Sequence, residues 1–229
     1  MKSIVFYGDP HNDFAPLLAA LAEQPADCVI MMGDLLDGRS PESATALASI
    51  QDLLDGPTEV YWIHGNHETD STEIHDKTLV ALHATNLHAR SQTILGGLRI
   101  AGLGGVFRGK VWIPDGRYAN EIAYHSRVDM VDSLEHNELW RGGVPLRHRT
   151  SIFPEDFDAL SKLHADILVT HEAPSTHCHG FTAIDDLAET MGVKVLIHGH
   201  THSTYEARLY NGIQVRCVGK QEVLRIDIP

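Results

Sequence analysis

The sequence predicts an α/β fold built on parallel β-strands. Two observations lead to this prediction. Short apolar runs rich in β-branched residues alternate with amphipathic helical segments between residues 3 and 83. Several apolar runs end at a glycine that is followed by a polar side chain, which is typical of buried strands that end at one edge of a sheet. We therefore expect right-handed βαβ units.

Strand and helix alternate in the N-terminal part of the chain. Strands are predicted at 3–7, 28–32 and 59–63, and each is followed by a helix, at 14–23, 41–54 and 71–83. Pro16 falls in the first turn of its helix, where the missing backbone N–H costs no hydrogen bond. Ser40 and Pro41 favour the N-cap and the first position of the second helix.

The rest of the chain continues the same pattern with one irregular stretch. Strands at 92–95 and 98–102 flank Gly96-Gly97, a good hairpin turn, and Asn211-Gly212 is a second strong hairpin signal. We interpret 104–152, with a helix at 128–139, as an irregular excursion over one rim of the fold within a single domain spanning 1–229. The remaining predicted elements are helix 154–163, strand 167–170, helix 182–191, and strands 195–198, 203–210, 213–218 and 223–228.

The composition favours a cytoplasmic globular protein. Apolar residues make up 43% and charged residues 21% of the chain, which is ordinary for such a protein. No apolar stretch reaches the roughly 18 residues that a membrane span needs, and the first strand begins too early for a signal peptide. A net charge of −13 argues against a broad nucleic-acid surface and leaves a small substrate as the expected partner. The sequence leaves the oligomeric state open.

Five predicted strand ends carry side chains that bind metals. The candidate ligands are Asp9, His11, Asp34, Asn66, His171, His200 and His202. We expect them to converge, because the carboxyl ends of neighbouring strands meet at one rim of a sheet. The set contains only oxygen and nitrogen donors, which suits Mn, Fe, Zn, Co or Ni better than a Cys-rich structural zinc site. Seven ligands are too many for one tetrahedral ion but suffice for two ions that share a carboxylate.

The order of these motifs resembles that of the calcineurin-like metallophosphoesterases. The matching segments are Asp9-Pro-His11, Gly33-Asp34-Leu-Leu-Asp37, Gly65-Asn66-His67-Glu68, His171 and Gly199-His200-Thr-His202. The resemblance implies a four-layer αββα sandwich, in which two mixed β-sheets are flanked by helices. It also implies a binuclear centre of divalent or trivalent transition-metal ions, with manganese the best choice in vitro.

The resemblance also implies a role for each matching residue. Asp9, His11, Asp34 and His202 would hold one ion, and Asp34, Asn66, His171 and His200 the other. A hydroxide that bridges the two ions is the implied nucleophile, and His67 is the implied acid that protonates the leaving oxygen. Glu68 stands where family members commonly carry Asp and would orient His67. Asp37 would support the site from outside the ligand set.

We therefore expect a dimetal-dependent phosphoesterase that hydrolyses a phosphate mono- or diester, with a small phosphorylated metabolite or nucleotide as the preferred substrate. Arg108, Lys110 and Arg117 are candidates for binding the substrate phosphate. Three alternatives remain open at this point: a catalytically inactive scaffold that binds a protein partner, a phosphoprotein phosphatase, and a metallohydrolase that acts on an amide or ester bond.

For several further residues, two roles remain open. Phe107, Trp112 and Tyr118 could stack on a base or pack in the core. The triplet His177-Cys178-His179 leaves open a further metal site, although it has no partner cysteine pair. We expect packing or supporting roles for His64 and His198. Surface or cap positions are expected for His83, His88, His125, His136, His148 and His164.

Overall fold

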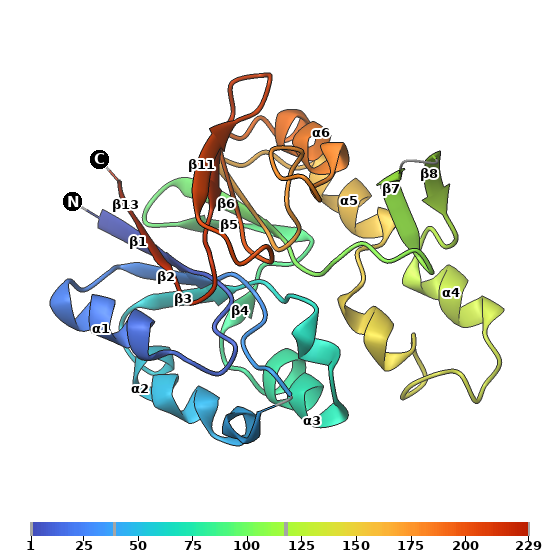
Figure 1. Ribbon diagram of the computed structural model, residues 1–229, viewed down its shortest axis with the longest axis horizontal. Helices are drawn as coiled ribbons and strands as arrows, with labels where there is room; N and C mark the ends of the chain where they lie inside the picture. The colour runs from blue at the N-terminus through green and yellow to red at the C-terminus, as the bar shows by residue number, and fades with distance from the viewer. Residues whose placement is uncertain (1, 39, 117–118, 229) are drawn as a thin grey trace.

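The structure is a computed structural model that describes residues 2–38, 40–116 and 119–228. Two mixed β-sheets form the body of the molecule, and helices cover the outer face of each sheet (Figure 1). This is the αββα arrangement expected from the sequence. Within the described residues, no helix is both long enough and apolar enough to cross a membrane.

The first sheet has the strand order β13-β1-β2-β3-β4. Its strands are β1 (Lys2–Tyr7), β2 (Cys28–Met31), β3 (Glu59–Trp62), β4 (Thr85–Asn86) and β13 (Val223–Ile228). Strands β1 to β4 are parallel, and the C-terminal strand β13 closes one edge by pairing antiparallel with β1. The first crossover contains the predicted helix α1 (Ala15–Glu23).

The second sheet has the strand order β11-β12-β10-β9-β6-β5. Its strands are β5 (Arg90–Ile94), β6 (Leu98–Leu103), β9 (Ile167–Thr170), β10 (Val195–His198), β11 (Tyr205–Arg208) and β12 (Gln214–Cys217). Both edges are antiparallel pairs, β5 with β6 and β11 with β12, and these are the two hairpins that the glycine-containing turns predict. The inner strands are parallel.

The predicted helices beside the first sheet are shorter and more irregular than expected. The helix predicted at 41–54 is divided into η1 (Pro41–Ala44), η2 (Ala46–Ile50) and α2 (Gln51–Leu54). The hydroxyl of Ser49 donates a hydrogen bond to the carbonyl of Ala46, and such contacts compete with regular helix formation. The helix predicted at 71–83 consists of α3 (Thr72–His75) and a π-helical turn, η4 (Asp76–Val80), preceded by η3 (His67–Thr69).

The segment 104–152 contains structure that the sequence reading missed. Strands β7 (Trp112–Gly116) and β8 (Ala119–Ile122) form a two-stranded sheet that was not predicted. Helix α4 (Arg127–Ser133) ends six residues before the predicted boundary, because Leu134 has an extended backbone. The 3₁₀-helix η5 (Leu146–Thr150) returns the chain to helix α5 (Pro154–Ser161), and helix α6 (Thr182–Thr190) follows β9.

Three apolar cores separate the four layers. Strand β1 shows how they arise, because successive strand residues face opposite sides. Ile4 and Phe6 belong to the core between the two sheets, and Val5 and Tyr7 to the core under α1.

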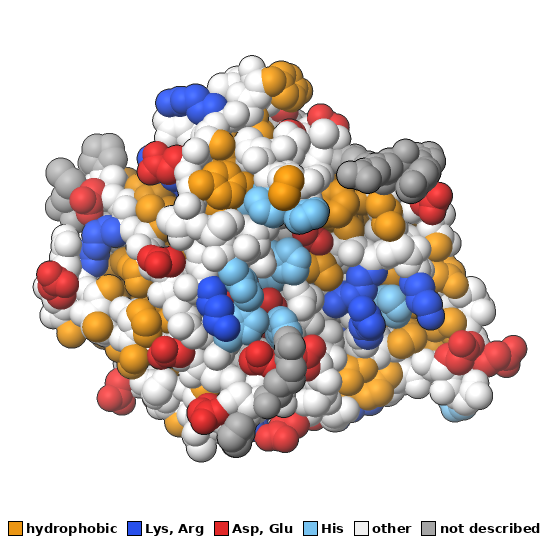
Figure 2. All heavy atoms as spheres, viewed as in Figure 1, with side chains coloured by type: hydrophobic (Ala, Val, Ile, Leu, Met, Phe, Trp, Pro, Cys, Tyr) orange, Lys and Arg blue, Asp and Glu red, His pale blue; other side chains and the backbone are white. Residues whose placement is uncertain are grey.

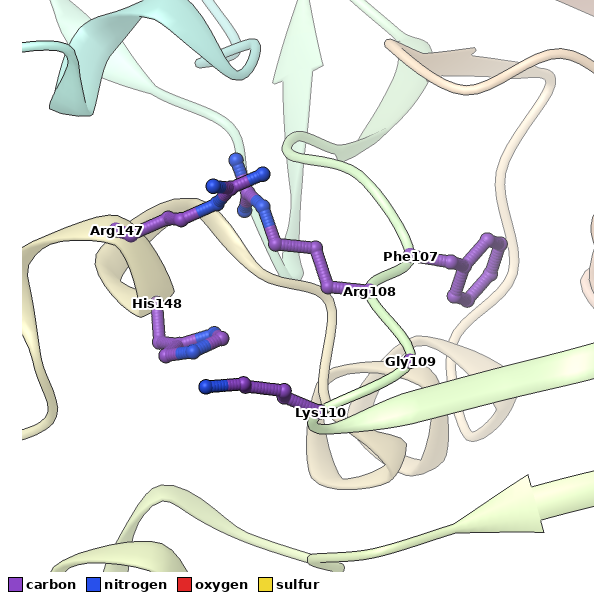
Figure 3. Close-up of a pocket in the computed structure, with 6 residues that line it drawn as sticks. All are labelled: Phe107, Arg108, Gly109, Lys110, Arg147 and His148. Carbon is purple, nitrogen blue, oxygen red and sulfur yellow. The ribbon is translucent and has the colours of Figure 1, made fainter.

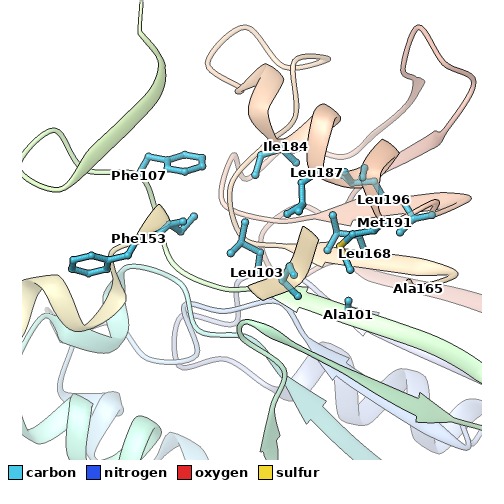
Figure 4. Packing of buried hydrophobic residues seen from close by; sticks show 14 of the residues in the cluster. Ala101, Leu103, Phe107, Phe153, Ala165, Leu168, Ile184, Leu187, Met191 and Leu196 are labelled. Atoms are coloured by element: carbon cyan, nitrogen blue, oxygen red, sulfur yellow. The ribbon is translucent and has the colours of Figure 1, made fainter. Parts of the chain in front are cut away.

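A third core lies between the second sheet and helices α5 and α6 (Figure 4). Phe107 and Trp112 belong to it, with ring centroids 5.1 Å apart. These two rings are core residues, so the idea that they stack on a base is wrong. Tyr118 lies outside the described residues.

Candidate metal centre

The predicted ligands meet where strands of both sheets end. In Figure 2, histidine side chains gather with acidic groups near the centre of one face. The first sheet supplies Asp9 and His11 after β1, Asp34 after β2 and Asn66 after β3, and the second supplies His171 after β9 and His200 and His202 after β10. Each strand therefore fixes the position of a ligand-bearing loop, and the packing of the sheets brings the loops together.

The backbone of these loops is strained. Residues other than glycine rarely adopt a positive φ, although Asp, Asn and His do so more often than others. In the described chain such residues are concentrated here: Asp9 (φ 39°), His11 (43°), Asp34 (51°), His200 (68°) and His202 (54°). Strain of this kind persists only where the surrounding structure imposes it, and it clusters at functional sites.

Two motif glycines allow the loops to approach one another closely. A Cβ atom on Gly65 would lie 2.2 Å from Asp34 Oδ1 and 2.6 Å from His171 Nε2. Gly33 has a φ of +96°, and a Cβ there would lie 2.7 Å from His171 Nδ1. The glycines before Asp34 and Asn66 are therefore required by the geometry of the site, which any side chain would disturb.

The first group of ligands contains Asp9, His11 and His202, whose ligand atoms all lie within 4.8 Å of one another. His11 Nε2 and His202 Nε2 are 3.1 Å apart. The Asp9 carboxylate is fully buried and accepts a hydrogen bond from the backbone N–H of His200. Burial and the charge of Asp34 raise the pKa of Asp9 to about 7, against the opposing effect of His171.

The second group contains Asp34, His171 and His200, again within 4.8 Å. His171 Nδ1 donates to the carbonyl oxygen of Met32 at 2.8 Å, which directs Nε2 toward Asp34 Oδ2, 3.4 Å away. Burial alone would raise the pKa of Asp34, but the positive charge of His171 outweighs it and lowers that pKa. Asp34 Oδ2 is also 3.8 Å from His11 Nε2, so this carboxylate lies between the two groups.

The chemistry of the site fits metal ions. Buried polar atoms are normally hydrogen-bonded, yet Asn66 Oδ1 and His171 Nε2 are buried without a hydrogen-bond partner among the described residues. Asn66 Oδ1 can offer a lone pair to a cation, and His171 Nε2 can do so when its ring is neutral. The donors are carboxylate, amide and imidazole groups, a set that suits transition metals such as Mn, Fe or Zn.

The hydrogen-bond partner of His67 in the structure is Asp70, whereas the sequence indicated Glu68. Glu68 was expected to orient His67, but its buried carboxylate accepts hydrogen bonds from the backbone N–H groups of Leu35 (2.7 Å) and Gly65 (2.6 Å). Glu68 therefore fixes the two loops that carry ligands. Asp70 Oδ2 lies 2.6 Å from His67 Nδ1. Asp70 was not among the residues predicted from the sequence. The i,i+3 spacing of Asp70 from His67 in a helical turn is the signal that indicates this contact.

Asp37 lies at the edge of the site. Its Oδ2 is 3.7 Å from His11 Nδ1, and its ligand atoms group with those of His67 and Asp70 within 4.8 Å. The amide side chain of Asn12 holds the Asp37 backbone by donating to its carbonyl oxygen and accepting from its N–H, both at 3.0 Å. Asn12 is a second supporting residue that the sequence analysis did not identify.

The basic candidates are divided between a pocket and an undescribed segment. Arg108 and Lys110 line a cavity together with Arg147 and His148. His148 was expected at the surface or in a cap, but it lies inside η5 and only 6% of it is exposed, so that expectation is wrong. Arg117 lies outside the described residues.

His64 and His198 pack beside the ligand loops. His64 Nδ1 is 3.2 Å from the amide nitrogen of Asn86, and His198 Nε2 is 2.8 Å from the Tyr205 hydroxyl. Both rings are almost fully buried. Their side chains hold the ends of β3 and β10.

The triplet His177-Cys178-His179 forms a loop after β9. Within the described residues, no group of three metal-ligand atoms includes any of its members. The two histidine rings are 5.7 Å apart, and the backbone N–H of His179 donates to His177 Nδ1. These contacts give no support to a further metal site.

The geometry agrees with the comparison to known proteins. The sequence model of calcineurin-like phosphoesterases matches residues 2–204. The chain belongs to the calcineurin-like phosphoesterase family. An uncharacterised protein of Haemophilus influenzae is 39% identical over 217 residues, which cover 94% of this chain and 90% of that protein.

Solved structures share the fold at much lower sequence identity. A dimetal phosphatase of Danio rerio superimposes with a TM-score of 0.62 and 16% identity, covering 96% of this chain and 88% of the other. The NAD nucleotidase of Haemophilus influenzae gives a TM-score of 0.52 and 15% identity, covering 99% and 47%. The family is dimetal-dependent, and the structure has Asp/His clusters that could bind such ions.

Proposed function

We propose that this protein is a dimetal-dependent phosphoesterase that hydrolyses a phosphate mono- or diester of a small metabolite or nucleotide. The observation that carries the proposal is the pair of buried, unpartnered atoms Asn66 Oδ1 and His171 Nε2 at the Asp/His clusters around Asp34. A purely structural cluster would leave these atoms unsatisfied at a cost of about 1–3 kcal/mol each. The acidic net charge of −13 favours a small anionic substrate over a long nucleic acid.

The ligands divide between two ions in this proposal. Asp9, His11, Asp34 and His202 would hold one ion, and Asp34, Asn66, His171 and His200 the other. When bound, the ions would neutralise the phosphoryl oxygens and lower the pKa of an attacking water molecule.

His67 is the proposed acid for the leaving group. Its ring packs edge to face against His11, with centroids 4.9 Å apart, and its side chain is partly exposed. Burial disfavours the charged ring, but the charge of Asp34 and the hydrogen bond to Asp70 raise the pKa of His67 overall. The Asp70 contact uses Nδ1. Nε2 is therefore the nitrogen that would give a proton to the departing oxygen.

The general proposal is tested by activity with defined substrates. Protein loaded with Mn²⁺ should hydrolyse p-nitrophenyl phosphate, bis-p-nitrophenyl phosphate, or both. The metal content is measured on the same sample. Absence of turnover with Mn, Fe, Zn, Co and Ni, at confirmed metal occupancy, would show that the protein is a metal-binding scaffold and not a phosphoesterase.

The role of His67 is tested separately. His67→Ala should retain both metals and lose activity by about 10²–10⁴-fold, the usual contribution of a positioned acid. His83→Ala, which removes an exposed histidine from outside the site, is the matched control and should behave as wild type. Loss of metal from His67→Ala would mean that this histidine is a ligand and that the assignment is incorrect.

A further inference from the structure

A basic pocket lies beside the candidate metal centre. The cavity has a volume of about 470 Å³ and is lined by Phe107, Arg108, Gly109, Lys110, Arg147 and His148. Figure 3 shows the side chains of Arg108, Lys110, Arg147 and His148 turned toward a common space, whereas Phe107 points away from it. The Phe107 ring packs into the apolar core shown in Figure 4. The ring anchors the loop, and the four polar side chains face the ligand space.

The positively charged side chains of the basic pocket form no direct ion pairs among the described residues. Within the described residues, no carboxylate forms an ion pair with Arg108, Lys110 or Arg147, whereas Arg127 and Arg141 both pair with carboxylates. The contrast is informative in a chain with a net charge of −13. Like charges that are held together repel one another, and a bound anion relieves this repulsion.

The electrostatics of the individual side chains agree with an anion site. Burial and the charge of Arg147 lower the pKa of Arg108 to about 10, against the opposing charge of Glu172, so Arg108 stays charged near neutral pH. Burial and the three neighbouring cations lower the pKa of His148 to about 4. A neutral His148 can still form a hydrogen bond to a phosphate oxygen.

Hydrogen bonds connect the basic pocket to the metal centre. Arg108 Nη1 donates to the hydroxyls of Thr150 (3.3 Å) and Ser151 (3.1 Å). The Thr150 hydroxyl lies 2.8 Å from that of Thr69, which follows His67 by two residues. The charges of Asp34 and Asp70 also act on Arg108. Figure 2 shows Lys and Arg side chains on the same face as the histidine cluster and next to it.

We propose that the basic pocket binds a second phosphate group of the substrate while the scissile phosphate lies at the metal centre. This inference rests on the proposed phosphoesterase function and names the substrate class as organic phosphates with two phosphate groups. Arginine donates a planar pair of N–H groups that matches phosphate oxygens, and lysine adds a compact positive charge. A monophosphate can occupy only one of the two sites.

Kinetics with matched nucleotides test the proposal. With Mn²⁺-loaded protein, kcat/KM for adenosine 5′-diphosphate or adenosine 3′,5′-bisphosphate should exceed that for adenosine 5′-monophosphate by at least about tenfold. The double variant Lys110→Ala/Arg147→Ala changes two exposed side chains and should bring this ratio close to one. Lys2→Ala/Lys162→Ala removes the same charge outside the pocket and should keep the wild-type ratio. A ratio near one in the wild-type protein, or a preference that survives in the pocket variant, overturns the proposal.

A binding measurement separates this inference from the proposed function. Calorimetry on Mn²⁺-loaded His67→Ala protein should show tighter binding of the two-phosphate nucleotides than of the monophosphate, and Lys110→Ala/Arg147→Ala in that background should abolish the difference. If wild-type protein hydrolyses neither p-nitrophenyl phosphate nor bis-p-nitrophenyl phosphate, the proposed function fails, while the binding preference still decides the role of the pocket. A different result is that mono- and two-phosphate nucleotides bind equally well while the pocket variant loses the binding of inorganic phosphate that wild-type protein shows. That result would identify a site for free phosphate and contradict the proposal.

Discussion

The contact between His67 and Asp70 defines the chemistry available to a single residue in this site. Asp70 Oδ2 lies 2.6 Å from His67 Nδ1, and the exposed fractions of the two side chains are 14% and 33%. A carboxylate at this position fixes the ring and favours its protonated form. Glu68, one residue after His67, is fully buried and holds the backbone of Leu35 and Gly65 instead. The two carboxylates therefore have different partners: Asp70 contacts the His67 ring, and Glu68 holds the backbone of the loops that carry ligands.

We expect Asp70→Asn to lower kcat by about 10–100-fold while the metal content stays unchanged, because the variant weakens the proton donor and removes no ligand. The loss should be larger for phenyl phosphate than for p-nitrophenyl phosphate, since a poor leaving group depends more on protonation. Steady-state kinetics with both substrates measure this difference. Asp52→Asn, at an exposed position on α2, is the control. Equal losses with the two substrates would show that Asp70 has only a structural role.

At the scale of elements, an ion pair between Arg127 and the buried carboxylate of Asp156 attaches the segment 104–152 to helix α5. Arg127, at the start of α4, donates from Nη1 to Asp156 Oδ1 at 2.7 Å and from Nη2 to Oδ2 at 2.9 Å. Asp156 is 4% exposed and also accepts from the backbone N–H of Phe153, which fixes the N-terminus of α5. Removing Asp156 would take away these hydrogen bonds and leave Glu155 as the carboxylate that pairs with the half-buried Arg127.

Asp156→Asn should therefore lower the free energy of unfolding by about 1–3 kcal/mol near neutral pH, the usual loss of a charge-assisted hydrogen bond. Burial favours the neutral acid, but His88 and Arg127 outweigh it and lower the pKa of Asp156 below its ordinary value of 3.8. The ionised carboxylate consequently stabilises the fold above that value, and the stabilisation is lost as the pH falls toward the folded-state pKa. Urea denaturation of both proteins across this range measures the effect, with exposed Asp158→Asn on the same helix as the control. A difference in stability that is the same at every pH would exclude the ion pair as its source.

Strands were easier to predict from the sequence than helices, and the reason is physical. Runs such as Cys28–Met31 and Ile167–Thr170 are buried on both faces, so every residue in them is apolar or small. The helix predicted at 41–54 depends on weaker local preferences, and side-chain hydrogen bonds such as that of Ser49 divide it. The β7–β8 pair depends on packing of Trp112 in the third core, which no local pattern encodes.

The ligand-bearing motifs could be identified from the sequence, because each follows a buried strand. The contacts between these motifs could not be predicted in this way. Asp9 and His200 are 191 residues apart and meet through a backbone hydrogen bond. Arg108 reaches Thr150 across 42 residues, and the Thr150 hydroxyl lies 2.8 Å from that of Thr69, so the basic pocket adjoins the segment that carries His67. Contacts of this kind arise from the packing of the two sheets and of the segment 104–152. They can therefore be identified only in the three-dimensional structure.

Because the first sheet supplies Asn66 and the second supplies His200, bound metal would join the two sheets directly. We therefore expect Mn²⁺ to raise the Tm of the whole protein, by about 5–10 °C at a concentration of roughly 100 Kd. His200→Ala should lose most of this increase, since a ligand of the native state is missing while the metal-free fold is retained. Scanning calorimetry at several Mn²⁺ concentrations measures the shift, and His83→Ala, which lacks an exposed histidine outside the site, should respond as wild type. An equal rise in Tm for His200→Ala would mean that the ion stabilises the protein at some other position, and that the sheets are held together by their apolar core alone.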